Sequence, residues 1–167
     1  VEGGRNGAPM PAAHGAGTLV EIRDLFFATP ARAKFLKTAQ AEAAAVLDVV
    51  RRQAIANPGV AFTALSEGRT VLRLAAQAPG EAGLRARLGD ILGTEFATNS
   101  VAVSAERERT KISGFAGLPT FNRANAQMQY LFVNGRAVKD RLLVGAVRGA
   151  YADFLARDRH PALAFVD

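Results

Sequence analysis

The sequence predicts an α+β domain in which helices pack on one sheet. The chain has 167 residues, of which 49% are hydrophobic and 22% charged, so it has enough apolar material for a core and the charge content of a globular protein. Segments with apolar residues at helical spacing alternate with short runs typical of strands. The predicted order is one strand followed by α-β-β-α-β-β-β-α-β, which is the pattern of an α+β domain preceded by a strand of another unit.

The first thirty residues predict a loop, a strand and a helix start. Residues 1–16 are rich in Gly, Ala and Pro, lack periodicity, and predict a loop or disordered segment. Residues 18–23 alternate weakly between apolar and polar and predict a strand that runs into an apolar corner at 24–27. Thr29 is placed to cap a helix, with Pro30 at its first position, where the missing N–H costs nothing.

Residues 31–56 predict an amphipathic helix over an alanine-rich background. It is either one long helix or two helices broken near 37–38. The sequence Asn-Pro-Gly at 57–59 closes it. On this interpretation Phe35 and Leu36 contribute to the core, because they lie on the apolar side of the helix.

The middle of the chain predicts two β-hairpins and a short helix between them. Each hairpin consists of two β-rich runs around a short polar turn. The helix carries leucines at helical spacing and stops at Gly93. The predicted ranges are strands 60–65 and 70–74, helix 81–92, strands 101–106 and 111–116, and a polar loop over 117–126.

The last forty residues predict a strand, a turn, a helix and a final strand. Residues 130–133 are continuously apolar and predict a central strand. Asn134 and Gly135 tolerate positive φ and predict a tight turn from this strand into a helix over 140–156. Residues 162–167 predict the final strand.

Charge and missing residue types limit the chemistry. Lys and Arg number 21 against 15 Asp and Glu, so the net charge of +6 favours a polyanionic partner. The chain has no Cys and two His, and it lacks a phosphate-binding P-loop motif, so we nominate no catalytic and no metal-binding residue. No run of about 18 apolar residues predicts a membrane span, so no membrane partner is expected.

Two segments carry distinctive motifs. Residues 17–37 read GTLVEIRDLFFATPARAKFLK, and residues 130–142 read YLFVNGRAVKDRL. They resemble the MutL family of DNA mismatch repair proteins, whose patterns are G-T-x-V-x-V-x-D-L-F-x-N-x-P-A-R-x-K-F-L-K and F-V-N-G-R-x-V-x-D. The resemblance covers residues 17–167. Ala28 departs from the pattern, because the family usually has Asn there.

The resemblance implies a two-part organisation. Residues 1–30 would be the C-terminal edge of a GHKL-type ATPase domain, including its last strand. Residues 31–167 would form a transducer domain of the ribosomal protein S5 domain 2-like type, truncated at its C-terminal end. The family's catalytic and metal-binding motifs lie outside this segment, so the resemblance implies that ATP and Mg²⁺ are bound mostly elsewhere. The segment is not expected to hydrolyse ATP alone.

The resemblance also assigns candidate site residues. Gly17 and Thr18 match the family's Gly-Thr motif beneath the adenine and are the candidate nucleotide contacts. Arg136, Lys139 and Arg141 are the candidate DNA contacts, and Arg141 aligns with a family Arg that supports DNA binding. Three cations beside a predicted helix N-terminus oppose the helix dipole, which also favours an anionic partner. The alternative interpretation of all three is a solvated basic surface.

The partners implied by the resemblance are DNA, a MutS-type mismatch sensor and a second copy of the protein, in a bacterial cytoplasm near the nucleoid. DNA contacts would be made to phosphates, because no aromatic stacking platform is evident, so binding would be independent of sequence and sensitive to salt. Two alternatives remain open. A ribosomal S5-like RNA-binding module would need stacking aromatics or a denser basic face. The transducer domain of a type II topoisomerase would need a Gln-Thr-Lys nucleotide contact.

Overall fold

The structure is a computed structural model that describes residues 2–166. The chain divides into two compact units, the first ending at Ala43 and the second beginning at Ala44. The boundary falls within the residues of helix α2, Ala39–Ala56.

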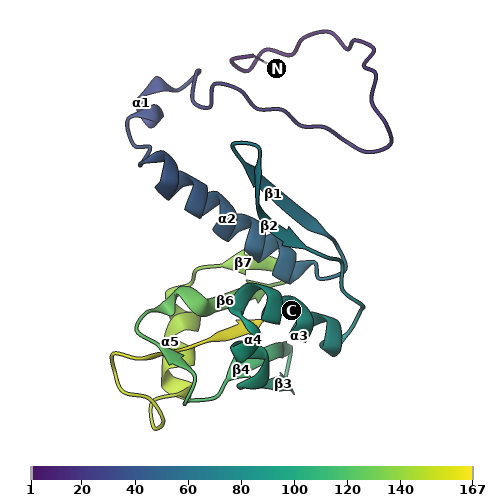
Figure 1. Cartoon of the computed structure of the whole chain (residues 1–167). Coiled ribbons are helices and arrows are strands. Elements are labelled where there is room, and N and C mark those ends of the chain that lie inside the picture. Colours follow the sequence, from purple (N-terminus) through teal and green to yellow (C-terminus); the bar gives the residue numbers. More distant parts are fainter. Residues whose placement is uncertain (1, 167) are drawn as a thin grey trace. The chain divides into compact units, whose positions relative to one another are not determined.

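The predicted strand over 18–23 is not present. Apart from an isolated bridge between Glu2 and Arg5, the segment before residue 30 runs as loop and turns (Figure 1). Leu19, Val20 and Ile22 are exposed. A strand is stabilised by hydrogen bonds to a neighbour, and none of the described strands pairs with this segment. The alternation of apolar and polar residues is therefore not sufficient for a strand here.

The predicted helix over 31–56 consists of two helices, as the second of the two interpretations has it. Helix α1, Pro30–Ala33, has Pro30 in its first turn, but the side chain of Thr29 makes no capping hydrogen bond. Thr38 caps α2 instead, since its Oγ1 accepts a hydrogen bond from the Ala41 N–H at 3.3 Å. The carboxylate of Glu42 accepts the Lys37 N–H at 2.9 Å. These two bonds fix the break at 37–38.

The prediction that Phe35 and Leu36 lie in the core is wrong. Phe35 is 83% exposed and Leu36 is 46% exposed. The reason is that α1 ends at Ala33, so both residues lie in the connection between the helices rather than on a helix face.

The second unit contains the remaining elements, and both predicted hairpins are present. The structure adds a short helix after Gly93 and three short strands that the sequence did not predict. The elements are β1 Phe62–Ser66, β2 Arg69–Leu74, α3 Glu81–Leu92, α4 Thr94–Thr98, β3 Ser100–Arg107, β4 Thr110–Gly117, β5 Asn122–Arg123, a 3-10 helix Ala126–Met128, β6 Gln129–Val133, β7 Arg136–Val138, α5 Arg141–Ala150, β8 His160–Pro161 and β9 Leu163–Phe165.

A five-stranded sheet organises this unit, in the order β3-β4-β9-β6-β7. The final strand of the sequence, β9, lies at its centre and pairs parallel with β6 and antiparallel with β4. The strand predicted over 130–133 is therefore an interior strand, and its apolar sequence follows from burial on both faces.

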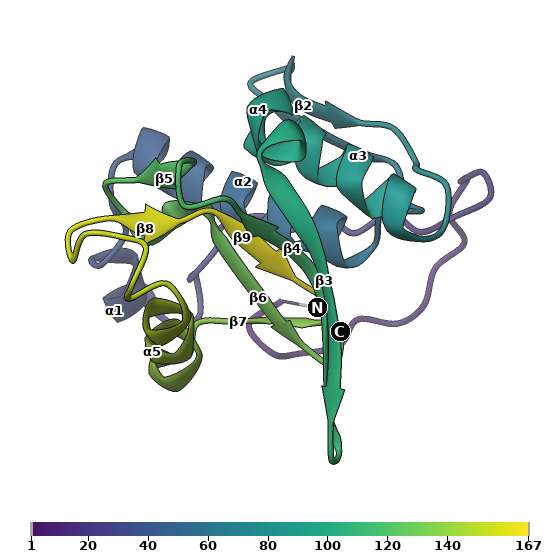
Figure 2. The same ribbon diagram turned by 90° about the horizontal axis from the view of Figure 1, so that it is seen from below.

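Helices cover both faces of the sheet (Figure 2). Alternate residues of β6 and β9 point to opposite faces, so Tyr130 and Phe132 contribute to one core and Leu131 to the other. The larger core also contains residues of α2, α3 and α4, among them Ile55, Leu88 and Phe96. The smaller core is closed by α5 through Val147. The sheet thereby holds α2 and α5 in fixed places within the second unit.

Helix α5 is shorter than the predicted helix over 140–156. It ends at Ala150, and residues 151–154 form turns. Leu142 and Phe154, two large apolar residues within the predicted range, are exposed. Gly149, next to the last residue, weakens the helix at its end, because glycine gains more backbone freedom on leaving a helix than other residues do.

A fully buried arginine anchors the base of the first hairpin. The Nη2 atom of Arg87 donates to the carbonyl oxygens of Pro58, Val60 and Ala75 at 2.7–2.8 Å. Burial lowers the pKa of Arg87. Since Pro58 and Val60 precede β1 and Ala75 follows β2, one side chain of α3 ties both ends of the hairpin together. Within residues 2–166, no helix is both long and apolar enough to cross a membrane.

Candidate nucleic-acid interface

A groove of about 930 Å³ lies between the second-unit part of α2 and the segment that joins β7 to α5. Residues of β6 form its floor, among them Gln129 and Tyr130. The charged side chains that line the groove are four cations and two carboxylates, namely Asp48, Arg51, Arg52, Lys139, Asp140 and Arg141.

Arg52 is the most fixed of the four cations. Its Nε donates to the Asp48 carboxylate at 2.9 Å, and its guanidinium lies 4.8 Å from the centre of the Tyr130 ring. The side chain is only 12% exposed. Stacking and ion pairing together hold this guanidinium at the floor of the groove.

Asp48 links the two sides of the groove. The Nζ of Lys139, which is 78% exposed, lies 3.6 Å from the same Asp48 oxygen that Arg52 contacts. Partial burial acts to raise the pKa of Asp48, but the hydrogen bond and charge of Arg52, together with Lys139, outweigh it, so the pKa lies below its ordinary value. Asp48 is therefore an ionised carboxylate between two cations.

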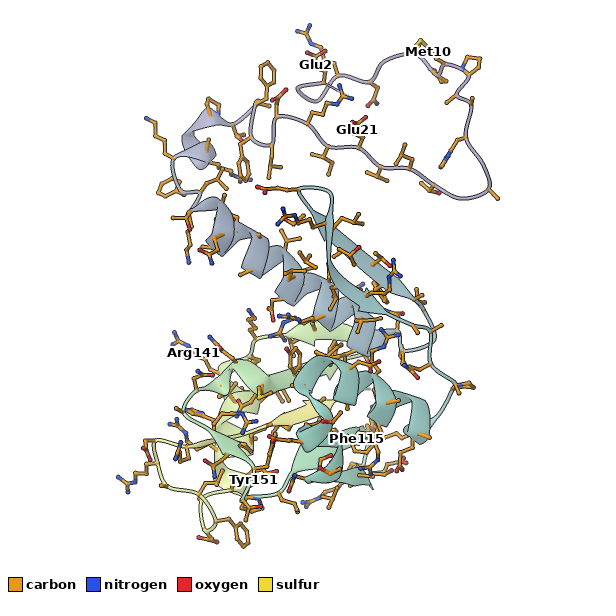
Figure 3. The ribbon with its side chains drawn as sticks, viewed as in Figure 1. Glu2, Met10, Glu21, Phe115, Arg141 and Tyr151 are labelled. Carbon is orange, nitrogen blue, oxygen red and sulfur yellow. The ribbon has the colours of Figure 1, made fainter. Side chains whose placement is uncertain are left out.

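The other carboxylate caps α5. Asp140 Oδ1 accepts the N–H groups of Leu142 at 2.8 Å and Leu143 at 3.1 Å. These N–H groups are thus satisfied by the protein and are not available to a phosphate. Arg141 is the first residue of the helix and is exposed, and Figure 3 shows it at the opposite end of α5 from Tyr151.

The structure separates the three predicted DNA contacts. Lys139 and Arg141 line the groove, but Arg136 does not. Asn134 and Gly135 have φ values of +50° and +73° and form the turn of a β-hairpin, so the chain enters β7 rather than a helix. Arg136 is the first residue of β7 and is exposed. The predicted strand-to-helix turn is wrong, because the turn joins two strands, β6 and β7.

Arg51 and Arg52 also line the groove, although the sequence did not predict them there. Both lie in α2, almost ninety residues before Lys139, and only the packing of α2 on the sheet brings them to the groove. The one sequence signal is an adjacent Arg pair in a helix otherwise rich in Ala and Val. Long-range proximity of this kind cannot be obtained from periodicity.

Gly17 and Thr18 lie in the first unit. Gly17 has a φ of +124°, which favours glycine, and Thr18 is exposed, so its hydroxyl is free to contact a ligand. Residues 2–166 contain no cluster of three His, Cys, Asp or Glu that could hold a metal ion. Within the described residues, Thr18 therefore presents an exposed hydroxyl in the first unit, and no carboxylate cluster is present for Mg²⁺.

The sequence is similar to known mismatch repair proteins. The family described as DNA mismatch repair protein, C-terminal domain, matches residues 88–166. The DNA mismatch repair protein MutL of Phenylobacterium zucineum is 59% identical and that of Paramagnetospirillum magneticum 56% identical, each over 98% of this chain and 27% of the relative. The chain belongs to the MutL family. It spans about a quarter of the length of these MutL relatives.

Solved MutL structures share the fold. The ATPase domain of Aquifex aeolicus MutL complexed with ADP has 30% sequence identity and a TM-score of 0.59, and the match covers 87% of this chain and 50% of that one. The N-terminal domain of a DNA repair protein, at 18% identity, shares the fold with a TM-score of 0.63 over 82% of this chain and 45% of that one. The fold is the α+β, S5 domain 2-like transducer type, and MutL membership argues against the ribosomal and topoisomerase alternatives.

Proposed function

We propose that this chain is the part of a MutL protein that couples the nucleotide state of an ATPase domain to DNA binding. In this proposal residues 1–30 belong to the edge of the ATPase domain and residues 31–167 to the transducer domain. The groove between α2 and α5 receives the phosphate backbone of DNA. Lys139 and Arg141 are contacts on one side and Arg51 is a contact on the other, while Arg52 adds positive charge at the floor of the groove.

The observation that carries the proposal is the convergence of four cationic side chains, from two elements distant in sequence, on one groove. Two carboxylates also line the groove, but each is already engaged, Asp48 with cations and Asp140 with backbone N–H groups. The groove keeps an excess of positive charge, and side chains such as Arg141 remain exposed.

The chemistry of the groove favours contacts to the DNA backbone over base recognition. Its one aromatic side chain, Tyr130, is buried and already stacked against Arg52, so it offers no face to a base. Lys and Arg at the rim contact phosphates, which every sequence presents. We therefore expect binding that is independent of sequence and falls steeply with salt. Arg136 lies outside the groove and would at most extend this surface.

The coupling part of the proposal is supported by α2. This helix begins in the first unit, which carries Gly17 and Thr18, and its later residues line the groove in the second. A nucleotide that favours one arrangement of the units would thereby favour one arrangement of the groove. In the proposal, Thr18 contacts the base of ATP, while Mg²⁺ and the phosphates are held by residues outside this segment. Hydrolysis of the bound ATP would supply the free energy for the change between arrangements.

Family membership extends the proposal to protein partners. A MutS-type mismatch sensor and a second copy of the protein would respond to the same change of state, with ATP favouring the dimer. Sedimentation of the full-length protein with and without a non-hydrolysable ATP analogue measures directly whether ATP favours the dimer.

The DNA proposal is tested by replacing Arg141 with Glu in the full-length protein. Affinity for a 30-base-pair duplex is measured by fluorescence anisotropy between 50 and 200 mM salt, conditions in which each phosphate contact contributes about 0.9 to the slope of log K against log salt. We expect the slope to fall by about one and the affinity to fall at every salt concentration. The matched control is Arg107→Glu, an exposed residue at the far end of β3 that does not line the groove.

An unchanged slope in Arg141→Glu would contradict the proposal, as would an equal loss in the Arg107→Glu control. Thermal unfolding of each variant checks that the fold is retained. Arg141 is exposed, so its replacement should leave the unfolding temperature nearly unchanged.

A further inference from the structure

A second basic pocket lies beyond the groove, at the other end of α5. It has a volume of about 410 Å³ and is formed by α5, the turns that follow it and β8. We call it the second basic pocket. Its basic lining residues are three arginines and a histidine, namely Arg148, Arg157, Arg159 and His160.

The pocket has no carboxylate in its lining, unlike the groove. Among residues 2–166, none of Arg148, Arg157 and Arg159 forms an ion pair. Like charges gathered on one hollow without counter-charges repel one another, and an anion in the pocket removes that repulsion. The two acidic residues of the adjoining turns, Asp153 and Asp158, are exposed and do not line the pocket.

A buried amide connects the pocket to the groove. Gln129 is only 9% exposed and lines both hollows, as does Val144. The Gln129 Nε2 donates to the Pro161 carbonyl at 3.3 Å, whereas its Oε1 is buried without a hydrogen-bond partner. The groove and the pocket are thus adjacent hollows that share two lining residues.

The spacing along α5 fits a nucleic-acid strand. Arg141, Val144 and Arg148 are at positions i, i+3 and i+7, so they lie on one face of the helix. Seven residues of helix advance by about 10.5 Å. Successive phosphates on one strand of B-DNA wind around the duplex axis as well as rising about 3.4 Å along it, so this spacing reaches phosphates about one to two steps apart. A backbone that runs along α5 would meet Arg141 and then Arg148.

We propose that the second basic pocket is a DNA-phosphate subsite that continues the track of the groove along α5. Arg148 and Arg159 are its principal contacts, with Arg157 and His160 at its edge. This inference rests on the proposed function, since it requires that the groove and the pocket bind the same DNA. Its ligand is the phosphodiester backbone, without preference for sequence.

The test uses the double variant Arg148→Gln/Arg159→Gln in the full-length protein, on the same 30-base-pair duplex and over the same salt range. Loss of two phosphate contacts should lower the salt slope by about 1.8 and the affinity at 100 mM salt by about tenfold or more. The conservative variant Arg148→Lys/Arg159→Lys keeps both charges and should keep most of the slope. An unchanged slope in the Gln variant, or an equal loss in the Lys variant, overturns the proposal.

The groove variant distinguishes failure of this inference from failure of the proposed function. If Arg141→Glu lowers the slope and the Gln double variant does not, the groove binds DNA and the pocket does not. If only the Gln double variant lowers it, the pocket binds DNA and the proposed groove contact is wrong. If both lower it and their effects add in the triple variant, the continuous track is supported.

Discussion

At the scale of single residues, Asp48 is the carboxylate that pairs with two of the groove's cations. Its carboxylate contacts Arg52 at 2.9 Å and Lys139 at 3.6 Å, as a DNA phosphate would. Arg52 is nearly buried and has further support from Tyr130, whereas Lys139 is largely exposed. DNA that binds Lys139 must therefore compete with an internal carboxylate, and Asp48 reduces the affinity that the cations alone would give.

We predict that Asp48→Asn raises the affinity for DNA several-fold and increases the magnitude of the salt slope, because Lys139 is released and one negative charge is removed. Anisotropy on the 30-base-pair duplex measures both. The control is Asp90→Asn, which removes a carboxylate that accepts a hydrogen bond from Gln77 at 3.1 Å outside the groove. Equal affinities for wild type and Asp48→Asn would refute the role of Asp48 as a competitor.

The same variant has a second, pH-dependent signature. Because the pKa of Asp48 is lower in the folded protein than its ordinary value of 3.8, its ionised form stabilises the fold above that value. This contribution is lost as the pH falls through the folded-state pKa. Urea unfolding should therefore show wild type more stable than Asp48→Asn at pH 7, with the difference shrinking below about pH 4. A difference that is constant with pH would contradict the ion-pair assignment.

At the scale of elements, sequence patterns were sufficient where a segment is stabilised locally. Both long hairpins have polar turns, and Glu67-Gly68 adopts the two positive φ values that such a turn needs. The break between α1 and α2 is also local, because Thr38 caps the first turn of α2. Strand β7 was missed because three residues give too short a pattern, although Asn134-Gly135 is a common hairpin signal. No strand forms over 18–23, although its pattern is long enough, because none of the strands described within residues 2–166 pairs with it.

Gly114 allows β4 and β9 to approach closely enough to pair. Gly114 in β4 has a φ of +141°, and a Cβ there would lie 2.1 Å from the Ala164 carbonyl oxygen in β9. We predict that Gly114→Ala costs several kcal/mol, since backbone of the central strand would have to move. The control is Gly145→Ala in α5, where a Cβ meets nothing within 4 Å and should stabilise the helix by about 0.5–1 kcal/mol. Chemical denaturation measures both, and similar stability of the two variants would contradict this account of the sheet.

At the scale of the whole molecule, the basic residues behind the net charge of +6 have different roles. Some are buried or paired within the protein, and others are exposed to solvent. Arg87 is buried as a structural anchor and Arg52 is largely fixed by Asp48. The cations at the rim of the groove and in the second basic pocket are exposed enough to meet an anion, as are arginines outside both, such as Arg107 and Arg136. Composition could indicate a polyanionic partner but could not separate structural from free arginines, because that distinction depends on burial and on contacts between distant segments.

The division into two units leads to a final prediction. All five Lys and Arg residues before Ala43, namely Arg5, Arg23, Arg32, Lys34 and Lys37, are exposed in loop, turn or the single turn of α1. Cleavage by trypsin requires a locally unfolded segment, and these segments need little unfolding to be cut. Limited trypsin digestion of the 167-residue chain should therefore remove the first unit early and leave a fragment that begins near Thr38.

Within that fragment, Arg157 and Arg159 lie in the turns before β8 and should be cut next, whereas Arg87 is fully buried in α3 and should be cut last. Mass spectrometry of the digest over time gives the order. Added duplex DNA should delay cleavage at Arg157 and Arg159 if the second basic pocket holds a phosphate, and it should leave cleavage at Arg23 unchanged. Early cleavage at Arg87 would mean that α3 and the first hairpin do not form the anchored unit described above.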